Sequence, residues 1–159
     1  MASESIVINT GPLILLEKAD ALDLVARLPF QFFAPLAVRA ELDAGETRGF
    51  LSPSLPWVTF VPLQSPLSPI SQALLDVGEA QVIQLALERK IGRVCLDDLR
   101  GRRIAVASGL QVTGVLGLLG LAKTLGLIPA IKPYCDRLMQ AGAWYSTAVI
   151  RQALKDFGE

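Results

Sequence analysis

The sequence predicts an α/β fold, a three-layer α/β/α sandwich around a central, mostly parallel sheet. Short β-branched runs alternate with helix-like segments along the chain, which is the order that parallel strands joined by crossover helices require. The first run, Ile6–Ile8, has no polar alternation, as expected of a strand covered on both faces. The length of 159 residues suits one core, so we expect a single domain over residues 1–159.

The elements after the first strand are bounded by prolines and a glycine. Pro12 suits the first turn of a helix through residue 18, and Asp20 is a candidate cap for a second helix, which Pro29 stops. A short strand, FFA, then precedes Pro35. Pro35 starts the helix LAVRAELDAG, which ends at Gly45.

A proline-rich stretch follows. Five prolines surround WVTFV, the one strand-like run between Gly45 and Pro69. Because proline cannot donate to a ladder of hydrogen bonds, this pattern predicts a surface excursion with an edge strand. A helix-like pattern resumes at residues 70–75.

The second half of the chain returns to regular alternation. Apolar spacing predicts a long helix, EAQVIQLALERK, after Gly78, and Ser108-Gly109 is typical of a helix end. The glycines of GVLGLLG are spaced at three, which favours close helix packing over a phosphate-binding loop. The other predicted elements are a strand at 93–96, a helix at 99–107, a strand at 111–113, and helices near 115–125, 131–141 and 146–157.

Composition limits the classes of partner. Lys+Arg and Asp+Glu are both 15, so the net charge is zero and any contact with nucleic-acid phosphates must be local. Hydrophobic residues make up 52% of the chain and the mean hydropathy is +0.45, which is high for a soluble domain. Surplus apolar surface is usually covered in an oligomer or by a partner, so we do not expect a lone monomer.

Cysteine usage and the absence of a signal-peptide pattern predict a cytoplasmic location. Cys95 and Cys135 have neither the number nor the spacing of a disulfide framework or a metal site. The uncharged run from Ile104 to Ala122 has the length of a membrane span, but Ser108-Gly109 interrupts it. We therefore expect buried core there and no membrane segment.

Polar side chains stand at places where a parallel sheet binds ligands, beyond the carboxyl ends of its strands. Asn9 ends the first strand, and Asp97 and Asp98 end the strand at 93–96. Helical spacing predicts that Glu79 and Glu41 share the core-facing sides of their helices. Carboxylates directed at a core are costly unless a cation pairs with them. This chain has no histidine, so the acids favour a hard divalent ion, Mg²⁺ or Mn²⁺, which activates water and stabilises phosphoryl oxygens.

Each of these residues also has a structural interpretation. Asp76 and Glu79 fit a capping box, Asp98 fits a helix N-cap, and Asn9 fits a turn-forming amide. Glu41 is equally compatible with a solvated helix face. The order of the residues along the chain, from strand end to helix to helix start to strand end, favours a shared site. Three basic residues follow just beyond the acids and either form a solvated helix face or contact a phosphate backbone, which the resemblance described next identifies as that of RNA: Arg100, Arg102 and Arg103.

Taken in order, several segments resemble the PIN-domain nucleases, especially the prokaryotic branch related to VapC-type toxins. They are IVINTGPLILLEKA, PLAVRAEL, LDVGEAQVIQLALERK, VCLDDLRGRRIA, LQVTGVLGLLGLAKTLGLI and LKDFGE. The resemblance implies a PIN-like fold and a Mg²⁺- or Mn²⁺-dependent endoribonuclease that cleaves RNA. It also implies the toxin of a toxin–antitoxin pair, neutralised by a cognate antitoxin protein, and a homodimer.

The resemblance also assigns site residues by position. The metal ligands fall on Asn9, Glu41, Glu79 and Asp98, with Asp97 as neighbour or substitute, and Thr10 would hold the cluster by hydrogen bonding. Asn9 departs from the family, which usually carries aspartate at this strand end, and an amide brings no charge to the ion. The alternative hypothesis is therefore an attenuated PIN-like module that binds RNA or protein. A nucleotide-binding protein is less compatible, because the sequence lacks the glycine-rich phosphate motifs.

Overall fold

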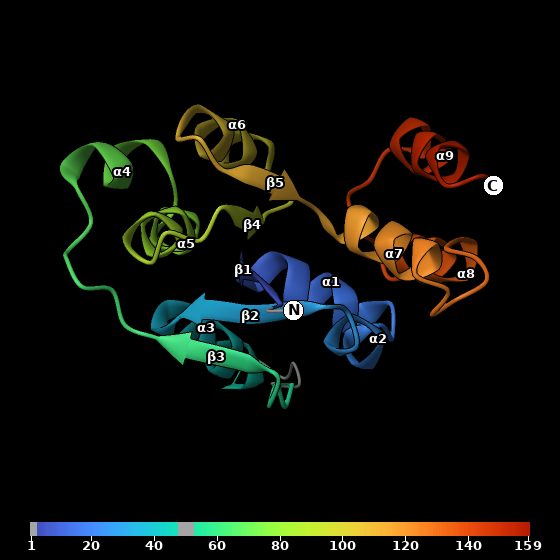
Figure 1. Ribbon diagram of the computed structural model, residues 1–159, viewed down its shortest axis with the longest axis horizontal. Helices are drawn as coiled ribbons and strands as arrows, with labels where there is room; N and C mark the ends of the chain where they lie inside the picture. The colour runs from blue at the N-terminus through green and yellow to red at the C-terminus, as the bar shows by residue number, and fades with distance from the viewer. Residues whose placement is uncertain (1–2, 48–52) are drawn as a thin grey trace. The chain divides into compact units, whose positions relative to one another are not determined.

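A computed structural model of the protein describes residues 3–47 and 53–159 (Figure 1). Within these residues, five strands form one sheet in the order β3-β2-β1-β4-β5, and every neighbouring pair is parallel. This confirms the predicted α/β fold with a central parallel sheet. The strands are β1 (Glu4–Ile8), β2 (Phe30–Pro35), β3 (Val58–Val61), β4 (Arg93–Cys95) and β5 (Gln111–Thr113).

Helices connect the strands and continue after the last one. The bounds of the helix at 99–107 and of the strand at 111–113 are those predicted, and β3 is the predicted edge strand. The helices are α1 (Thr10–Lys18), α2 (Leu22–Ala26), α3 (Leu36–Thr47), α4 (Pro69–Leu74), α5 (Val77–Glu88), α6 (Leu99–Ala107), α7 (Val115–Thr124), α8 (Lys132–Gln140) and α9 (Thr147–Asp156).

Several predicted helix ends are wrong for local reasons. The Asp76 side chain accepts a hydrogen bond from the Glu79 backbone N–H at 2.9 Å, so α5 begins at Val77 instead of after Gly78. Asp20 does not cap α2, because it has a φ of 55° and Ala21 occupies the N-cap without a side-chain bond. Gly45 does not end α3, which continues to Thr47, since a glycine weakens a helix without breaking it.

The chain divides into two compact units, and each is described by itself. The first unit comprises residues 1–12 and 29–113, and the second comprises residues 13–28 and 114–159. All strands and all predicted site residues belong to the first unit. The single domain over residues 1–159 stays a prediction.

The first unit is built on the sheet. Helix α3 packs on β2 and β3, α5 packs on β1, β2 and β4, and α6 packs on β5. The connection through α3 runs toward one edge of the sheet, whereas those through α5 and α6 run toward the other. Right-handed crossovers therefore place α3 on one face and α5 and α6 on the opposite face. Ile6, Val7 and Ile8 have no exposed surface, as predicted for a strand covered on both sides.

The second unit is helical. Helix α7 packs against α2 and α9. The Phe157 ring fills the place where a side chain on Gly120 would stand, which confirms the predicted close packing at this glycine. The Glu159 carboxylate accepts hydrogen bonds from the backbone N–H groups of Ile131 (2.7 Å) and Lys132 (3.1 Å) at the start of α8. The end of the chain is therefore held against two helices of this unit.

The apolar run from Ile104 to Ala122 is divided among α6, β5 and α7, with Gly109 at a φ of 86° between the first two. Among the described residues, none of the helices combines the length and the apolar character needed to cross a membrane. Cys95 and Cys135 are buried free thiols.

Candidate functional site

Asn9 stands at the carboxyl end of the central strand β1. Its backbone N–H donates to the Cys95 carbonyl oxygen at 3.2 Å, which ties the end of β1 to the end of β4. Its side-chain oxygen, Oδ1, is buried and has no hydrogen-bond partner among the described residues. The amide oxygen therefore does not form the turn that the structural interpretation of Asn9 requires. A buried oxygen without a partner is costly and is rare in folded proteins.

Glu41 reaches the same place from α3. A Cβ atom built on Gly78, in the first turn of α5, would lie 2.7 Å from Glu41 Oε1 and 3.3 Å from Asn9 Oδ1. The two oxygens therefore face one small space above this glycine. The prediction that Glu41 points into the core is wrong, since its side chain is exposed at the rim of the sheet. The helix is rotated so that Val38 and Leu42 take the buried positions instead.

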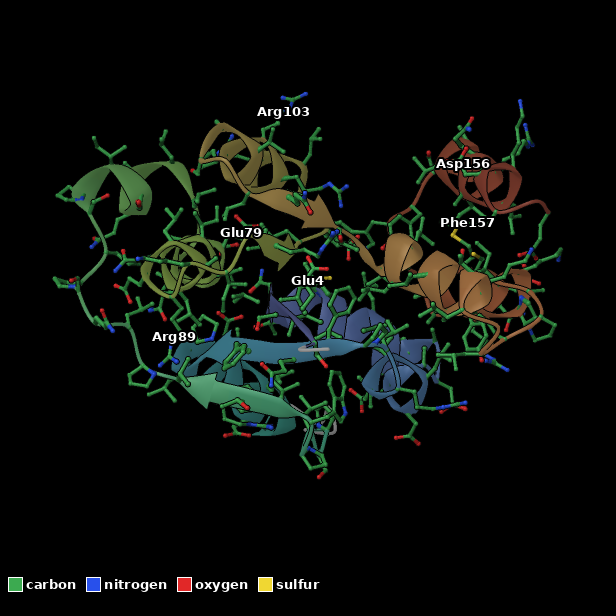
Figure 2. All side chains as sticks on the ribbon, viewed as in Figure 1. Glu4, Glu79, Arg89, Arg103, Asp156 and Phe157 are labelled. Atoms are coloured by element: carbon green, nitrogen blue, oxygen red, sulfur yellow. The ribbon has the colours of Figure 1, made fainter. Side chains whose placement is uncertain are left out.

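Glu79 is the next residue of α5 and is buried, with 7% of its surface exposed (Figure 2). Burial is the largest cause that raises the pKa of its carboxyl from 4.5 to about 7. The negative charges of Asp76 and Asp98 and a hydrogen bond with the Asp98 side chain raise this pKa further. A hydrogen bond from the Asp76 backbone acts in the opposite direction.

The predicted caps are formed, and they position the acids. Asp76 and Glu79 exchange the hydrogen bonds of a capping box at the start of α5. Asp98 Oδ2 accepts from the Gly101 backbone N–H at 3.0 Å at the start of α6. Because two helices thus begin beside each other, the Glu79 and Asp98 carboxyl groups meet, and the structural and functional interpretations of these residues are compatible.

Asp97 and Thr10 are the two remaining predicted residues at this edge of the sheet. The charge of Asp97, after burial, raises the pKa of the Cys95 thiol, whereas it is Asp98 that acts on Glu79. Thr10 is buried, and its hydroxyl oxygen has no partner among the described residues. The hydrogen bonding assigned to Thr10 therefore stays a prediction.

A comparison with protein families identifies the family of this chain. The model of the family DUF3368, described as a PIN domain, matches residues 5–159. The chain belongs to the PIN-domain family. Neither the curated proteins nor the solved structures yield a match to it. PIN domains are in general nucleases that use divalent metals, so the family indicates a nucleic acid as substrate.

The predicted site of this PIN domain offers oxygen atoms that a divalent metal ion could bind. Mg²⁺ and Mn²⁺ prefer oxygen ligands, and the unpartnered Asn9 oxygen and the exposed Glu41 carboxylate face one space. In the described part of the chain, no three or more His, Cys, Asp and Glu side chains are grouped to hold a metal ion. The predicted ligands form two pairs: Asn9 and Glu41 meet over Gly78, and Glu79 meets Asp98. Gly78 and Glu79 are consecutive residues of α5. The oxygen donors of both pairs fit the preference of a hard divalent cation.

An open groove of about 630 Å³ adjoins the second acid pair of the PIN domain. Asp76, Glu79 and Asp98 line it together with Arg100 and Arg103, both on α6. The groove therefore combines acids with exposed guanidinium groups. From the sequence alone, Asp76 is expected only to cap the helix. It also lines the groove and its charge raises the pKa of Glu79, and its place one turn before Glu79 in the D-x-x-E pattern is the signal for this second role.

The remaining arginine of α6, Arg102, bonds to the backbone of the protein. Arg102 Nη1 donates to the Leu96 carbonyl oxygen at 2.8 Å, and the side chain is half-buried. This bond ties α6 to the end of β4. Arg102 does not line the groove, in contrast to the two arginines on either side of it.

Proposed function

We propose that this PIN domain is a Mg²⁺- or Mn²⁺-dependent endoribonuclease of the VapC-like branch. The observation that carries the proposal is the buried Asn9 oxygen without a partner, which faces the Glu41 carboxylate over the start of α5. Glu79, the residue after Gly78 in that helix, forms the second pair with Asp98. An oxygen-only donor set at the carboxyl edge of a parallel sheet supports a hard cation and phosphodiester chemistry.

The proposed ligands have distinct tasks. Glu41 and Asp98 bring negative charge, and Asn9 brings a neutral oxygen. The raised pKa of Glu79 favours its protonated form without metal, and Glu79 would lose this proton when it binds the ion. When bound, the ion would activate a water molecule and offset charge on the phosphoryl oxygens. Thr10 and Asp97 flank these residues. Arg100 and Arg103, exposed on the groove, would hold the RNA backbone, while Arg102 orients the helix that carries them.

We further propose that the nuclease is a cytoplasmic toxin that forms a homodimer and is neutralised by an antitoxin protein. Large apolar side chains of the first unit are exposed, and one of them, Leu99, lines the groove. Such surface is usually covered by a partner. The most exposed are Ile70 (71%), Leu99 (62%), Val106 (61%) and Val77 (56%). A small open reading frame for an antitoxin beside the gene would support the toxin role. Unhindered growth when the protein is expressed alone would contradict it.

A second candidate function is an attenuated PIN-like module that binds RNA or protein without cleaving it. Two observations favour it. Asn9 at the end of the central strand is uncharged, and in the described residues no three or more His, Cys, Asp and Glu side chains are placed to hold a metal ion. Such a module would keep the arginine-lined groove and lose the metal. The two candidates therefore differ in metal binding.

Calorimetry with Mn²⁺ separates them. We expect the protein to bind Mn²⁺, and expect Glu79→Gln and Asp98→Asn to weaken binding, because each removes charge from the donor set. Glu88→Gln is the matched control, because Glu88 lies on the same helix and holds the backbone N–H groups of Gln64 and Ser65. RNA cleavage that needs Mn²⁺ and stops with a chelator would complete the assignment. No binding at millimolar Mn²⁺ would favour the module.

A further inference from the structure

We infer that Gly78 is a positioning residue for the candidate metal site. The inference rests on the proposed function, and it assigns to Gly78 the task of leaving room for two ligand oxygens. Gly78 is the second residue of α5, is itself buried, and directly precedes Glu79. The Asn9 and Glu41 side-chain oxygens therefore lie over the Gly78 backbone. The next residue, Glu79, belongs to the other pair.

The space that Gly78 leaves is narrow. A Cβ atom at this position would lie 2.7 Å from Glu41 Oε1 and 3.3 Å from Asn9 Oδ1. The first distance is shorter than a van der Waals contact, so one of the two groups must move. The Glu41 oxygen is the end of an exposed, flexible side chain, whereas the Gly78 backbone is fixed by the first turn of α5. An added methyl group would therefore displace the carboxylate and leave the helix in place.

Two other glycines at helix starts show that this crowding is specific. Gly11 is also the second residue of its helix, and a Cβ atom there would meet nothing within 4 Å. A Cβ atom on Gly101, in α6, would touch Glu79 Cδ at 3.4 Å, which is an ordinary contact. Neither position has a positive φ, nor has Gly78, so alanine is compatible with the backbone at all three. They form a matched series.

The consequence differs between fold and site. Because only side-chain ends have to move, Glu41 Oε1 most and Asn9 Oδ1 by a few tenths of an ångström, we expect Gly78→Ala to keep the thermal stability of the wild type in a chelator. We expect its dissociation constant for Mn²⁺ to rise by about tenfold or more, the scale on which residues that orient metal ligands act. Gly11→Ala should bind Mn²⁺ like the wild type. A purely structural glycine would show the reverse, a loss of stability at unchanged affinity.

The test is Mn²⁺ calorimetry on the wild type, Gly78→Ala and Gly11→Ala, with melting temperatures measured in a chelator. Wild-type binding with weakened binding by Gly78→Ala alone supports the inference. Equal binding by Gly78→Ala and wild type overturns the inference and leaves the proposed function standing. A wild type that binds no Mn²⁺ overturns the proposed function and the inference with it.

A double variant keeps the test decisive if Gly78→Ala does not fold. In Glu41→Ala the carboxylate that the methyl group would displace is gone. Adding Gly78→Ala to this variant should therefore change its remaining Mn²⁺ affinity by less than threefold, because residues that act through one another are not additive. A further tenfold loss in the double variant would overturn the claim that Gly78 acts through Glu41.

Discussion

Asn9 is the residue that best distinguishes the two proposed functions, an active nuclease and an attenuated binding module. Its Oδ1 is buried without a partner beside Glu41, so it can accept a cation, but it adds no charge to hold one. Aspartate has nearly the same shape and would add that charge. We therefore expect the residue at this position to set the metal affinity of the proposed site without changing its geometry.

Asn9→Asp is expected to tighten Mn²⁺ binding by about tenfold, since affinity at oxygen sites follows ligand charge. The same variant should melt at a lower temperature in a chelator, because it places a second carboxylate, with a buried oxygen, beside the Glu41 carboxylate. Calorimetry and thermal melts with and without Mn²⁺ measure both effects. Asn9→Ala is the control that removes the oxygen. An Asn9→Asp variant that binds Mn²⁺ no better than the wild type would show that Asn9 is not a ligand.

Glu79 links the metal-free site to pH. Its folded-state pKa is about 7 against an ordinary value of 4.5. Between these values the unfolded chain gives up the proton and the folded chain keeps it, so Glu79 makes the fold less stable as pH rises through this window, with no further change above it. In a chelator, Glu79→Gln should therefore melt higher than the wild type at pH 8, and the two should converge as pH falls toward 4.5.

On the same helix, Glu88→Gln is expected to change the pH dependence of stability in the opposite direction to Glu79→Gln. The backbone N–H groups of Gln64 and Ser65, with the first the larger, lower the pKa of Glu88. This residue therefore stabilises the fold above its ordinary pKa, and the contribution is lost as pH falls. Glu88→Gln should melt lower than the wild type at pH 8. Equal pH profiles for the Glu79 and Glu88 variants would refute both assignments of cause.

At the scale of the helix, caps and ligands are the same side chains. Asp98 accepts the Gly101 N–H and also meets Glu79, so one substitution can separate its two tasks. Asparagine caps as well as aspartate, whereas alanine does not. Asp98→Asn should therefore retain stability and lose Mn²⁺ affinity. Asp98→Ala should lose both, with a cost of about 1 kcal/mol in the free energy of unfolding. Chemical denaturation and calorimetry compare them. An Asp98→Asn variant with wild-type affinity would reduce Asp98 to a cap.

Element by element, the sequence was most informative where local signals agreed. The bounds of α6 and β5 were predictable because Asp98 caps the helix and Gly109, with positive φ, ends it before the strand. The start of α5 was not, because Asp76 and Gly78 are both plausible boundary residues and only the hydrogen bond to Glu79 decides between them. The exposure of Glu41 depends on how α3 is rotated on the sheet, which spacing fixes only to within a fraction of a turn.

For the whole molecule, the sequence predicted the parallel sheet but not the division into two compact units. Strand signals are local, whereas the grouping of residues 13–28 with 114–159 depends on helix packing between distant segments. Likewise, Asn9 and Glu41 were predictable as members of one site from strand order. That they form one pair and Glu79 and Asp98 another could not be predicted, because it depends on side-chain positions over α5.

This division predicts that stability and metal binding can be changed separately. Phe157 fills the space over Gly120 in the second unit, so Phe157→Ala leaves a cavity between α7 and α9. Because Phe157 is only half-buried, we expect a loss of about 2 kcal/mol in the free energy of unfolding, below the range for a fully buried phenylalanine. All candidate ligands belong to the first unit, so the Mn²⁺ affinity of the folded variant should equal that of the wild type. Denaturation and calorimetry at a temperature where the variant is folded measure the two quantities. A variant that melts lower and also binds Mn²⁺ ten times more weakly would mean that the second unit shapes the site.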